Sequence, residues 1–536
     1  MTTLRPLAAA FVAALLVASL SGPAGASSRP MLEPLSYVEL VELSERDPLD
    51  ASLSARLEGV LRTPVVDNGA WESGVRPLKP STPALGRFLR VAFWNIERGL
   101  ELRTVIAALQ GPAALERVID RARFPRGSRA RAEVMQQARM LAEADVLVLN
   151  EADWGVPRTG YRNVAAEVAG ALKMNYAFGV EFVEVDPITL GTETFEEAPP
   201  AQRKVLLRNN RVDRARMKGL HGTAILSRYR LDNVRLVRFE NACYDWYATE
   251  KASVTKVEEG KRVASERVLL EKITREVRRG GRIMLAADLE DADIPGGKAT
   301  IVATHLENKC KPSCRVEQLG EVLAFVAPIP HPVVVAGDMN TTGGDATPTS
   351  VSREVRKRLG SGEWWARQAI ASFLGVGLGV KLLGSGATAI RRKGDPTVRN
   401  IPILSSNPEA KLFDTLEKFR FADGGAFDFR GDAARTADGK SGTLANSNER
   451  ALKGFETTFE VEQTYGPIGK LKLDWIFVKP ARLTDPSDRK QSYRFAPHFG
   501  RTYMELNTST KERMSDHCAL TVDLPFLEPK IVDDGR

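Results

Sequence analysis

The sequence predicts a layered α/β protein, because short strand-like runs alternate with helical patterns along most of its length. Residues 88–94 place alternate apolar side chains on one face, which is typical of a strand. Residues 128–144 and 315–326 instead repeat apolar side chains at helical spacing. Strands with helices between them indicate helix layers packed on β-sheets.

The remaining elements continue this alternation. Two short helical patterns, 37–45 and 49–61, come first and lead into a proline-rich stretch that ends near residue 86. The further strand-like runs are 145–150, 222–227, 282–289, 298–306, 332–338, 473–478 and 518–524. These runs are short and apolar, which favours buried strands.

The 536 residues can bury a large core, and changes in composition suggest how the chain is divided. The expected parts are a signal peptide at 1–26, an N-terminal extension and linker at 27–86, a main domain at 87–526 and a C-terminal tail at 527–536. Some connections in the main domain are too long for a compact fold. The expected insertions lie near 196–217, 250–279 and 342–469.

The amino terminus carries the features of an export signal. Arg5 precedes an apolar run at 7–20, and residues 24–26 (Ala-Gly-Ala) are the small residues that signal peptidases favour. The run is short for a membrane span, and an uncleaved N-terminal anchor is the alternative. We therefore expect an exported protein, periplasmic or secreted, whose mature chain begins near Ser27.

The largest expected insertion contains an apolar segment at 364–384. This segment is too short to span a bilayer. One interpretation is a helix buried within the insertion. The other is an interfacial helix that contacts lipid, which would give the protein a peripheral membrane contact.

The formal net charge of +8 suits an anionic partner. Nucleic acid, phospholipid and phosphate esters all fit this description. The charges are interspersed along the chain, so the charge balance does not choose among these partners. Nothing in the sequence indicates a protein partner.

The four cysteines leave the disulfide pattern open. Cys310 and Cys314 are close enough in sequence to pair in an oxidising compartment, and we expect that disulfide. Cys243 and Cys518 could pair with each other or remain buried thiols. The cysteines and histidines do not form a zinc-ligand pattern.

Polar side chains stand where several of the apolar runs end. They are Asn95, Glu97, Glu151, His305, Asp338, Asn340, Asp474, Asp516 and His517. In an open α/β sheet, binding sites form where strand ends converge. Hard oxygen ligands suit Mg²⁺, Mn²⁺ or Ca²⁺, so we expect these side chains to form one site around a divalent metal.

Asp338 and Asn340 follow three valines, an alanine and a glycine. In an extended chain, residues two apart point the same way, so both side chains would project together from the end of the strand. A turn is the alternative, because Asp and Asn favour turns.

Other candidate residues also have an explanation that needs no functional site. Asn95 could cap the segment that follows it, Glu151 could be a solvated loop acid, and His305 could be a satisfied core histidine. Asp474 is harder to explain in this way, because a lone charge within an apolar strand is costly to bury without a partner. All of these explanations would have to hold at once, which favours a site.

Seven motifs, taken in order, resemble those of the endonuclease/exonuclease/phosphatase superfamily. They are WNIERG, LNEAD, GLHGTAILSR, THLEN, AGDMN, LDWIF and SDHCAL, and they extend from Trp94 to Leu520. The resemblance implies a deoxyribonuclease I-like fold, which is a four-layer sandwich of two packed, mainly antiparallel β-sheets flanked by helices. The expected insertions match nothing in that superfamily.

The resemblance also implies roles for the strand-end residues. Glu151 would be the principal ligand of a catalytic divalent ion, Mg²⁺ or else Mn²⁺ or Ca²⁺. Asn95, Glu97 and Asp516 would lie near that ion.

The catalytic roles that the resemblance implies fall on the other five residues. Asp338 and Asn340 would position the attacking water and the phosphate, with Asp338 as a candidate general base. Asp474 would orient His517, which would contact or activate at the phosphorus. His305 would hold a phosphate oxygen or assist the leaving group. Such proton-transfer groups and a metal ion suit hydrolysis of an anionic phosphodiester.

The implied function is that of an exported, divalent-metal-dependent phosphodiesterase with a nuclease-like substrate. One alternative is a hydrolase of phospholipid, sphingomyelin or inositol-phosphate head groups, and another is a catalytically silent binding module of the same fold. The abasic-site endonuclease branch carries Tyr-x-Pro-Asn at the position of His305, which disfavours DNA repair. A silent copy should have lost ligands, whereas this sequence retains them.

Overall fold

The computed structural model describes residues 32–194, 200–252, 276–341, 400–401, 405–406, 409–437, 439, 450–451, 454–460 and 470–530. These residues belong to one compact unit, Leu32–Arg536. The expected signal peptide at 1–26, residues 253–275 of the second expected insertion and the apolar segment at 364–384 lie outside the described residues.

The first sheet has nine strands, most of them from the N-terminal half of the chain and two, β19 and β20, from its C-terminal end. Its main order is β1 (Val65–Asp67), β5 (Asn175–Glu184), β6 (Leu220–Ser227), β4 (Val146–Trp154), β3 (Gly86–Asn95), β20 (Leu520–Pro525) and β19 (His498–Thr502). In addition, β2 (Ser81–Thr82) pairs with β3, and β8 (Arg278–Gly280) pairs with β5. Strands β3 and β4 run parallel, whereas the other pairs in this sheet run antiparallel.

The second sheet has five strands. Their order is β18 (Asp474–Lys479), β11 (Val333–Asp338), β10 (Lys298–His305), β9 (Ile283–Glu290) and β7 (Asp232–Arg238). Strands β10 and β11 are parallel, because helix α12 connects them, and the other pairs are antiparallel. Both sheets are therefore mainly antiparallel, as expected.

The two sheets pack face to face over an apolar core. Leu89, Val91 and Phe93 of β3 lie in one buried cluster with Ile301 of β10 and Val334 of β11. Alternate residues of β3 point to the opposite face, toward the helices, which is the period-two pattern expected from the sequence.

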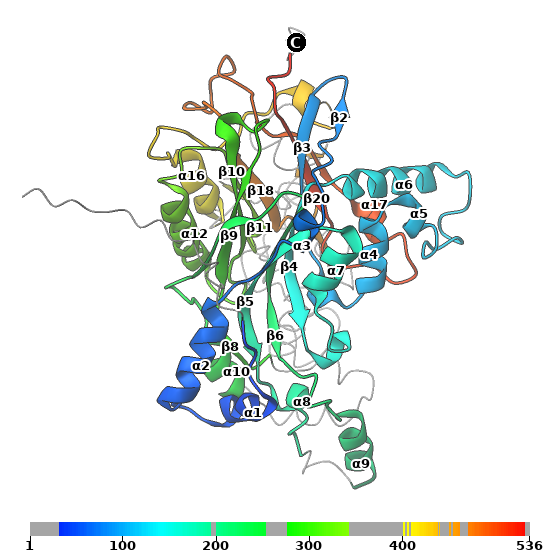
Figure 1. Ribbon diagram of the computed structural model, residues 1–536, viewed down its shortest axis with the longest axis vertical. Helices are drawn as coiled ribbons and strands as arrows, with labels where there is room; N and C mark the ends of the chain where they lie inside the picture. Colours follow the sequence, from blue (N-terminus) through cyan, green and yellow to red (C-terminus); the bar gives the residue numbers. More distant parts are fainter. Residues whose placement is uncertain are drawn as a thin grey trace, which may run out of the picture. The chain divides into compact units, whose positions relative to one another are not determined.

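Helices cover the outer face of each sheet (Figure 1). Helices α4 (Leu102–Leu109), α6 (Arg129–Ala142) and α7 (Val164–Leu172) pack on the first sheet. Helices α12 (Pro312–Val326) and α16 (Ala410–Lys418) pack on the second. The order helix, sheet, sheet, helix confirms the predicted four-layer sandwich.

Shorter elements complete the described part of the chain. The helices are α3 (Gly69–Glu72), α5 (Pro112–Leu115), α8 (Pro187–Leu190), α9 (Pro200–Asn209), α10 (Trp246–Ala252) and α17 (Met504–Asn507). The 3₁₀ turns are η1 (Glu97–Gly99), η2 (Pro157–Thr159), η3 (Pro295–Gly297) and η5 (Ala433–Arg435). The small hairpins are β12 (Asn400–Ile401) with β13 (Ser405–Ser406), β14 (Arg450–Ala451) with β15 (Gly454–Phe455), and β16 (Phe459–Glu460) with β17 (Lys470–Leu471).

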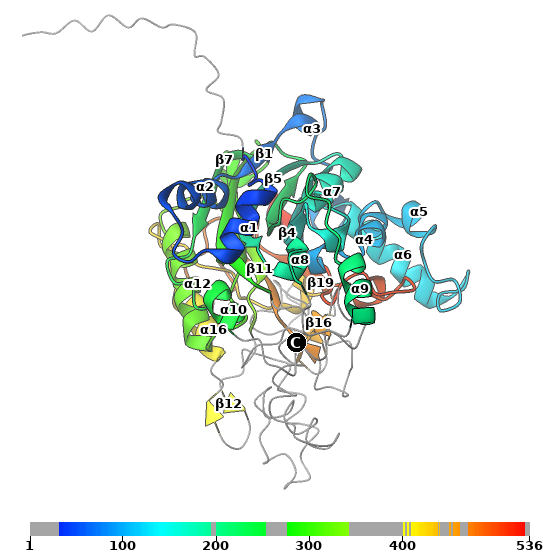
Figure 2. The same ribbon diagram turned by 90° about the horizontal axis from the view of Figure 1, so that it is seen from below.

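The N-terminal segment packs directly on the sandwich. Helix α1 (Tyr37–Glu45) begins after Ser36, which forms a capping box with Glu39, and helix α2 (Ala51–Arg62) begins after the N-cap Asp50. Figure 2 shows α1 and α2 beside β5 and β7, and α2 contacts both strands. Because β1 also extends the first sheet, this segment adds to the core rather than hanging free from it.

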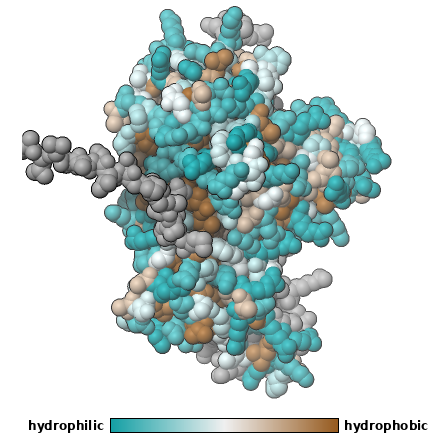
Figure 3. All heavy atoms as spheres, in the orientation of Figure 1, coloured by the Kyte–Doolittle hydropathy of each residue, from teal (hydrophilic) through white to brown (hydrophobic). Residues whose placement is uncertain are grey.

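The surface seen in Figure 3 is mostly hydrophilic, with hydrophobic side chains in small groups. The exposed large hydrophobic residues within the described ranges are Val38, Leu78, Leu207 and Leu527. Such scattered side chains are ordinary on a folded protein and identify no docking site. No described helix has both the length and the apolar character needed to cross a bilayer.

The disulfide joins Cys243 to Cys314, so the expected Cys310–Cys314 pair is wrong. The three sulfur atoms all lie within 4.8 Å of one another, because the fold places the loop before α10 against the first turn of α12. Proximity in sequence therefore does not decide the pairing. Cys310 keeps its thiol, which donates to the carbonyl oxygen of Glu307 at 3.3 Å, and the buried Cys518, also outside the disulfide, accepts from the side-chain amide of Asn507.

Replacing Cys243 by serine is expected to lower the free energy of unfolding by about 2–4 kcal/mol, because the disulfide closes a long loop in the unfolded chain. The two cysteines are 71 residues apart in sequence. Denaturant unfolding measures this change, and Cys310→Ser is the matched control, which should retain the disulfide. Peptide mapping without reductant that recovers Cys310 linked to Cys314 would contradict the pairing.

Candidate active site

The strand ends converge as the sequence predicts. In the first sheet, Asn95 at the end of β3 pairs with Asn150 of β4, which directly precedes Glu151. In the second sheet, His305 at the end of β10 pairs with Asp338 at the end of β11, which in turn pairs with Asp474 at the start of β18. The two sheets therefore present their polar strand ends to one another at one end of the sandwich.

Asn95 connects the two halves of this cluster. Its Nδ2 atom lies 3.2 Å from Glu151 Oε1 and also 3.2 Å from Asp338 Oδ2, so it can donate to both carboxylates. Its Oδ1 accepts from the backbone N–H of Glu97 at 3.2 Å, and Glu97 Oε2 accepts from the backbone N–H of Asp516 at 3.0 Å. The four predicted metal-ligand candidates thus lie together beside Asp338.

Buried carboxylates crowd one another at this point, which makes it suitable for a cation. Burial and the neighbouring Asp516 raise the pKa of Glu97 to about 8, and burial also raises the pKa of Asp516. Burial opposes ionisation of Glu151 too, but Arg98, His221 and His517 outweigh it and lower the pKa of that carboxyl. The site therefore offers the ionised Glu151, the Asn95 amide and two carboxyl groups, Glu97 and Asp516, whose ionisation is opposed until a cation is present. Such a set of oxygen ligands fits a hard divalent ion such as Mg²⁺.

Backbone strain gathers at the same place. Glu97, Arg98, Glu151 and Asn340 have φ values of +46°, +64°, +56° and +47°, the left-handed region that residues with a Cβ rarely adopt. Each such residue costs of order 1–3 kcal/mol and persists only where the surroundings hold it. Four of them around one cluster are typical of a functional site.

His517 lies deep in the cluster and is held as a cation. Its Nδ1 lies 2.8 and 3.0 Å from the two carboxylate oxygens of Asp474, so Nδ1 carries a proton and donates it. Burial alone would lower the pKa of His517, but Asp474, Asp516 and Asp338 outweigh it and hold the pKa well above its usual value. Its Nε2 faces Asp338 Oδ2 at 3.7 Å.

His305 lies on the other side of Asp338 and has the opposite character. Its Nδ1 is 2.7 Å from Arg282 Nη1, and because a guanidinium can only donate, Nδ1 must accept. Burial and then the charge of Arg282 lower the pKa of His305 well below its usual value. The ring is therefore neutral with its proton on Nε2, which faces Asp338 Oδ2 at 3.6 Å.

Arg282 is a residue that the sequence reasoning missed, and so is its partner Glu181. Arg282 Nη1 donates to Glu181 Oε2 at 2.7 Å, and its Nε lies 3.5 Å from Glu307 Oε2. Both residues are almost fully buried. The signal was present, because each is a lone charge in or beside an apolar strand, which is the argument that identified Asp474.

For Asp338 and Asn340 the sequence left open a turn or a shared site at the strand end, and the structure shows a turn that lies at the site. Strand β11 ends at Asp338, whose Oδ1 accepts from the backbone N–H of Asn340 at 2.8 Å, as in a turn. The side-chain amide of Asn340 donates to the carbonyl oxygen of Leu306 at 2.9 Å. The alternation of an extended strand therefore does not reach Asn340, and a turn brings it to the site. Burial and then Asp474 raise the pKa of Asp338 to about 7.

A buried chain of alternating charges supports the metal-ligand side of the cluster. Arg98 contacts Glu276, and Arg278 bridges Glu276 to Glu184. Arg158 then joins Glu184 to Asp153 at 2.9 and 2.7 Å. Each charge in this series of ion pairs has a partner of opposite charge. The series holds Arg98 beside Glu151, where the charge of Arg98 favours the ionised carboxylate.

The profile of the Endonuclease/Exonuclease/phosphatase family matches residues 92–517. The chain therefore belongs to that family, whose members are typically metal-dependent phosphodiesterases. A search of curated proteins found no match.

Solved structures with a similar fold include three whose sequences are distant from this one. The endonuclease/exonuclease/phosphatase from Beutenbergia cavernae is 17% identical, covers 82% of this chain and 72% of its own, and has a TM-score of 0.30. The human Nocturnin catalytic domain with bound sulfate is 13% identical, with coverages of 81% and 92% and a TM-score of 0.32. Truncated Caenorhabditis elegans TDP2 is 12% identical, with coverages of 83% and 99% and a TM-score of 0.32.

Proposed function

We propose that the protein is a divalent-metal-dependent phosphodiesterase with a nuclease-like substrate. The observation that carries the proposal is the position of Asp338, which lies between a cationic and a neutral histidine and is joined through Asn95 to a cluster of acidic residues. Asn95, Glu97, Glu151 and Asp516 would hold the metal. A divalent cation bound there supplies the positive charge that a phosphodiester needs as negative charge grows on its oxygens.

The side chains around Asp338 divide the remaining chemistry between them. Asp338 accepts the proton of the attacking water, which a carboxyl group with a pKa of about 7 can do near neutral pH. His517 donates from Nε2 to a non-bridging phosphoryl oxygen, and its charge stabilises the transition state. His305 donates from Nε2 to a second phosphoryl oxygen as a neutral group.

Asn340 and Asp474 act through their neighbours. Asp474 holds the Nδ1 proton of His517, so that Nε2 is directed at the phosphate. The side-chain oxygen of Asn340 would position the phosphate, while its amide group is bound to Leu306. We also propose, from the N-terminal pattern, that the enzyme acts after export to the periplasm or the exterior.

Hydrolysis of bis-p-nitrophenyl phosphate tests the proposal. We expect activity with Mg²⁺ or Mn²⁺, no activity in EDTA, and recovery when the metal is restored. An equal rate in EDTA would contradict metal dependence. DNA, RNA and sphingomyelin, compared side by side, then decide between a nuclease and a head-group hydrolase, and steep weakening by salt would favour nucleic acid.

Replacing Glu151 by glutamine should raise the Mg²⁺ concentration needed for half-maximal activity by more than about 100-fold. Replacing a residue that only orients a metal ligand already lowers metal affinity by roughly 10–100-fold, and Glu151 is expected to be a ligand itself. The amide keeps the size of the side chain but removes its charge. Titration calorimetry with Mg²⁺ measures the affinity directly. The exposed Glu133→Gln is the matched control, and an unchanged Mg²⁺ affinity in Glu151→Gln would remove Glu151 from the site.

A further inference from the structure

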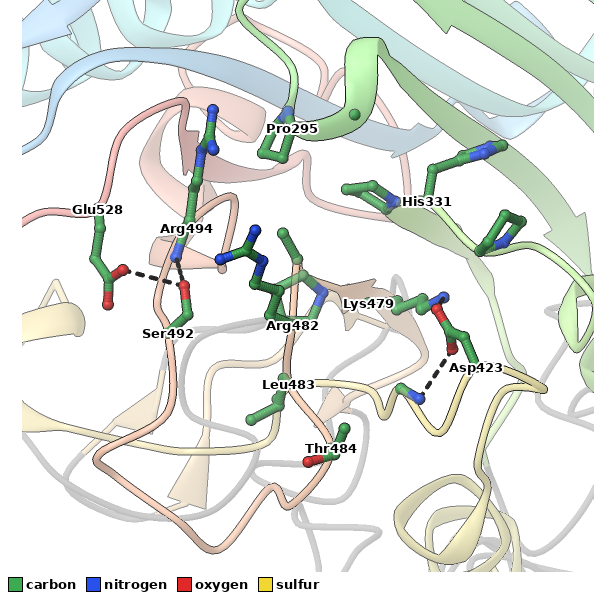
Figure 4. A pocket seen from close by; sticks show the side chains of 16 residues that line it. Pro295, His331, Asp423, Lys479, Arg482, Leu483, Thr484, Ser492, Arg494 and Glu528 are labelled. Atoms are coloured by element: carbon green, nitrogen blue, oxygen red, sulfur yellow. Dashed lines mark hydrogen bonds and ion pairs between the residues drawn. The ribbon is translucent and has the colours of Figure 1, made fainter.

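A cavity lies at the opposite end of the five-stranded sheet from the active site. It has a volume of about 740 Å³ and is lined by the segment before β11, the turn before β10 and the segment after β18 (Figure 4). Strand β11 separates it from Asp338 by about 20 Å at the rise of an extended chain. We propose that this cavity binds a dianionic phosphate group, of the kind that a phosphate monoester carries.

Two arginines in the lining have no acidic partner. Arg482 is exposed, and its side chain makes no hydrogen bond or ion pair within the described residues. Arg494 is half-buried and donates from Nε to the carbonyl oxygen of Phe526, which leaves its two terminal nitrogens without a partner among those residues. Figure 4 draws neither guanidinium in contact with a carboxylate. The cavity therefore offers two forks of N–H donors.

The acidic residues of the lining are occupied elsewhere. Asp423 accepts from Lys479 Nζ at 2.7 Å and from the backbone of Gly425. Glu528 accepts from the hydroxyl of Ser492 at 3.1 Å and from the backbone of Tyr493 at 3.0 Å. The Lys479–Asp423 pair cancels itself, whereas the hydrogen bonds to Glu528 leave its charge in place. The two arginines and Glu528 together give the lining one net positive charge.

The backbone at Arg482 is held in an unusual conformation. Its φ is +63°, in the left-handed region where a Cβ is disfavoured. A side chain that makes no contact within the protein gives no reason for an arginine at such a position. Strained residues tend to cluster where a ligand is held, so the strain and the unpartnered guanidinium point to the same role.

Part of the remaining lining is rigid and apolar. Pro295, Pro330, Pro332 and Pro480 contribute to the wall, together with Leu483. Proline rings fix φ, so this wall is formed before any ligand arrives and loses little entropy on binding. An apolar wall beside two guanidinium groups suits an organic body attached to an anion.

The number of acceptor oxygens favours a phosphate monoester over other anions. A monoester has three terminal oxygens, which can accept from both guanidinium groups, and it carries about −1.5 to −2 near pH 7. A carboxylate or a phosphodiester offers only two such oxygens, which one guanidinium group can fill. The monoester has two sources, a free small phosphate ester or the terminal phosphate of a nucleic acid strand.

Calorimetry on EDTA-treated protein with inorganic phosphate and phenyl phosphate tests the proposal. We expect both to bind, phenyl phosphate more tightly because its ring meets the proline wall, and at least a tenfold loss of affinity in Arg482→Ala/Arg494→Ala. Arg482→Ala alone, at an exposed position without contacts, covers the case in which the double variant fails to fold. The exposed Arg139→Ala, on α6, is the matched control and should bind as wild type.

Two further variants and probes make the outcomes distinct. Asp338→Asn alters the active site and should leave phenyl phosphate binding intact. Binding that is lost in Asp338→Asn but kept in the arginine variants would place the phosphate in the active site and overturn the proposal, without contradicting the proposed activity. An oligonucleotide with a 5′-phosphate, compared with its 5′-hydroxyl form, identifies the source: preferential binding that the arginine variants lose indicates a strand end, and equal binding of the two forms indicates a free ester.

Discussion

Replacing His517 by alanine is expected to lower kcat for a phosphodiester by about 10²–10⁴-fold, the range that a positioned proton-transfer group contributes. The reason is that His517 is the one cation that faces Asp338 through a ring nitrogen, with Nε2 at 3.7 Å from Oδ2. Its charge depends on Asp474, which holds Nδ1 at 2.8 Å. Loss of the ring removes both the charge and the donor that would meet the phosphate.

The alanine variant also leaves Asp474 buried without a partner, so loss of activity could follow from loss of stability. His517→Asn separates the two effects. The amide nitrogen of asparagine can take the place of Nδ1 and donate to Asp474, but the side chain has no counterpart of Nε2. We expect His517→Asn to unfold at nearly the wild-type denaturant concentration and to be as inactive as His517→Ala. Turnover near the wild-type rate in the folded His517→Asn variant would exclude His517 from catalysis.

The residues that sequence alone could place at the site share a simple property. Asn95, His305, Asp338 and Asp474 each stand at the end of an apolar strand, and the order of strands in a layered sheet brings such ends together. That argument needs only the hydrophobic pattern and the position of the polar residue within it. It therefore predicts which side chains lie together wherever those side chains end a regular strand.

Features that depend on packing between distant segments could not be read in this way. The left-handed backbone at Glu97 and Glu151 is imposed by neighbours, because neither residue favours that conformation locally. The choice of Cys243 over Cys310 as the partner of Cys314 depends on how the loop before α10 meets α12. The helical pattern at 37–45 predicted α1, but the sequence did not indicate the strands that the N-terminal segment packs against.

Removal of Arg282, whose charge beside an apolar strand is a signal present in the sequence, should have the second large effect. Arg282→Met leaves Glu181 and Glu307 buried without their cation, and breaking such a pair costs about 3–5 kcal/mol of the free energy of unfolding. Denaturant unfolding measures this loss. The double variant Arg282→Met/Glu181→Gln should recover part of it, because it removes one of the two unpaired charges, while Thr223 can still donate to the glutamine oxygen.

The double variant then isolates what Arg282 does to His305. In the wild type, burial and the Arg282 cation hold the pKa of His305 well below its usual value of about 6.5, so the ring is neutral across the working range of pH. Without that cation the pKa rises, although burial still holds it below its usual value, so His305 gains a proton at a less acidic pH than in the wild type. Its Nδ1 would then carry a proton, and the neutral Nε2 donor beside Asp338 would be lost. Protonation of Asp338 already lowers kcat of the wild type at acid pH, so we expect kcat of Arg282→Met/Glu181→Gln to fall more steeply than that of the wild type as the pH decreases.

Arg282→Lys is the control that keeps a cation beside His305, and its acid limb should resemble that of the wild type even if its rate is lower. A purely structural role for Arg282 would scale activity by the same factor at every pH. Superimposable profiles of the double variant and the wild type would therefore show that Arg282 only fills and neutralises the core. An acid limb steeper than that of the wild type, which Arg282→Lys suppresses, would show that the arginine sets the protonation state of His305. The two histidines that flank Asp338 would then owe their different charges to their partners, Asp474 for His517 and Arg282 for His305.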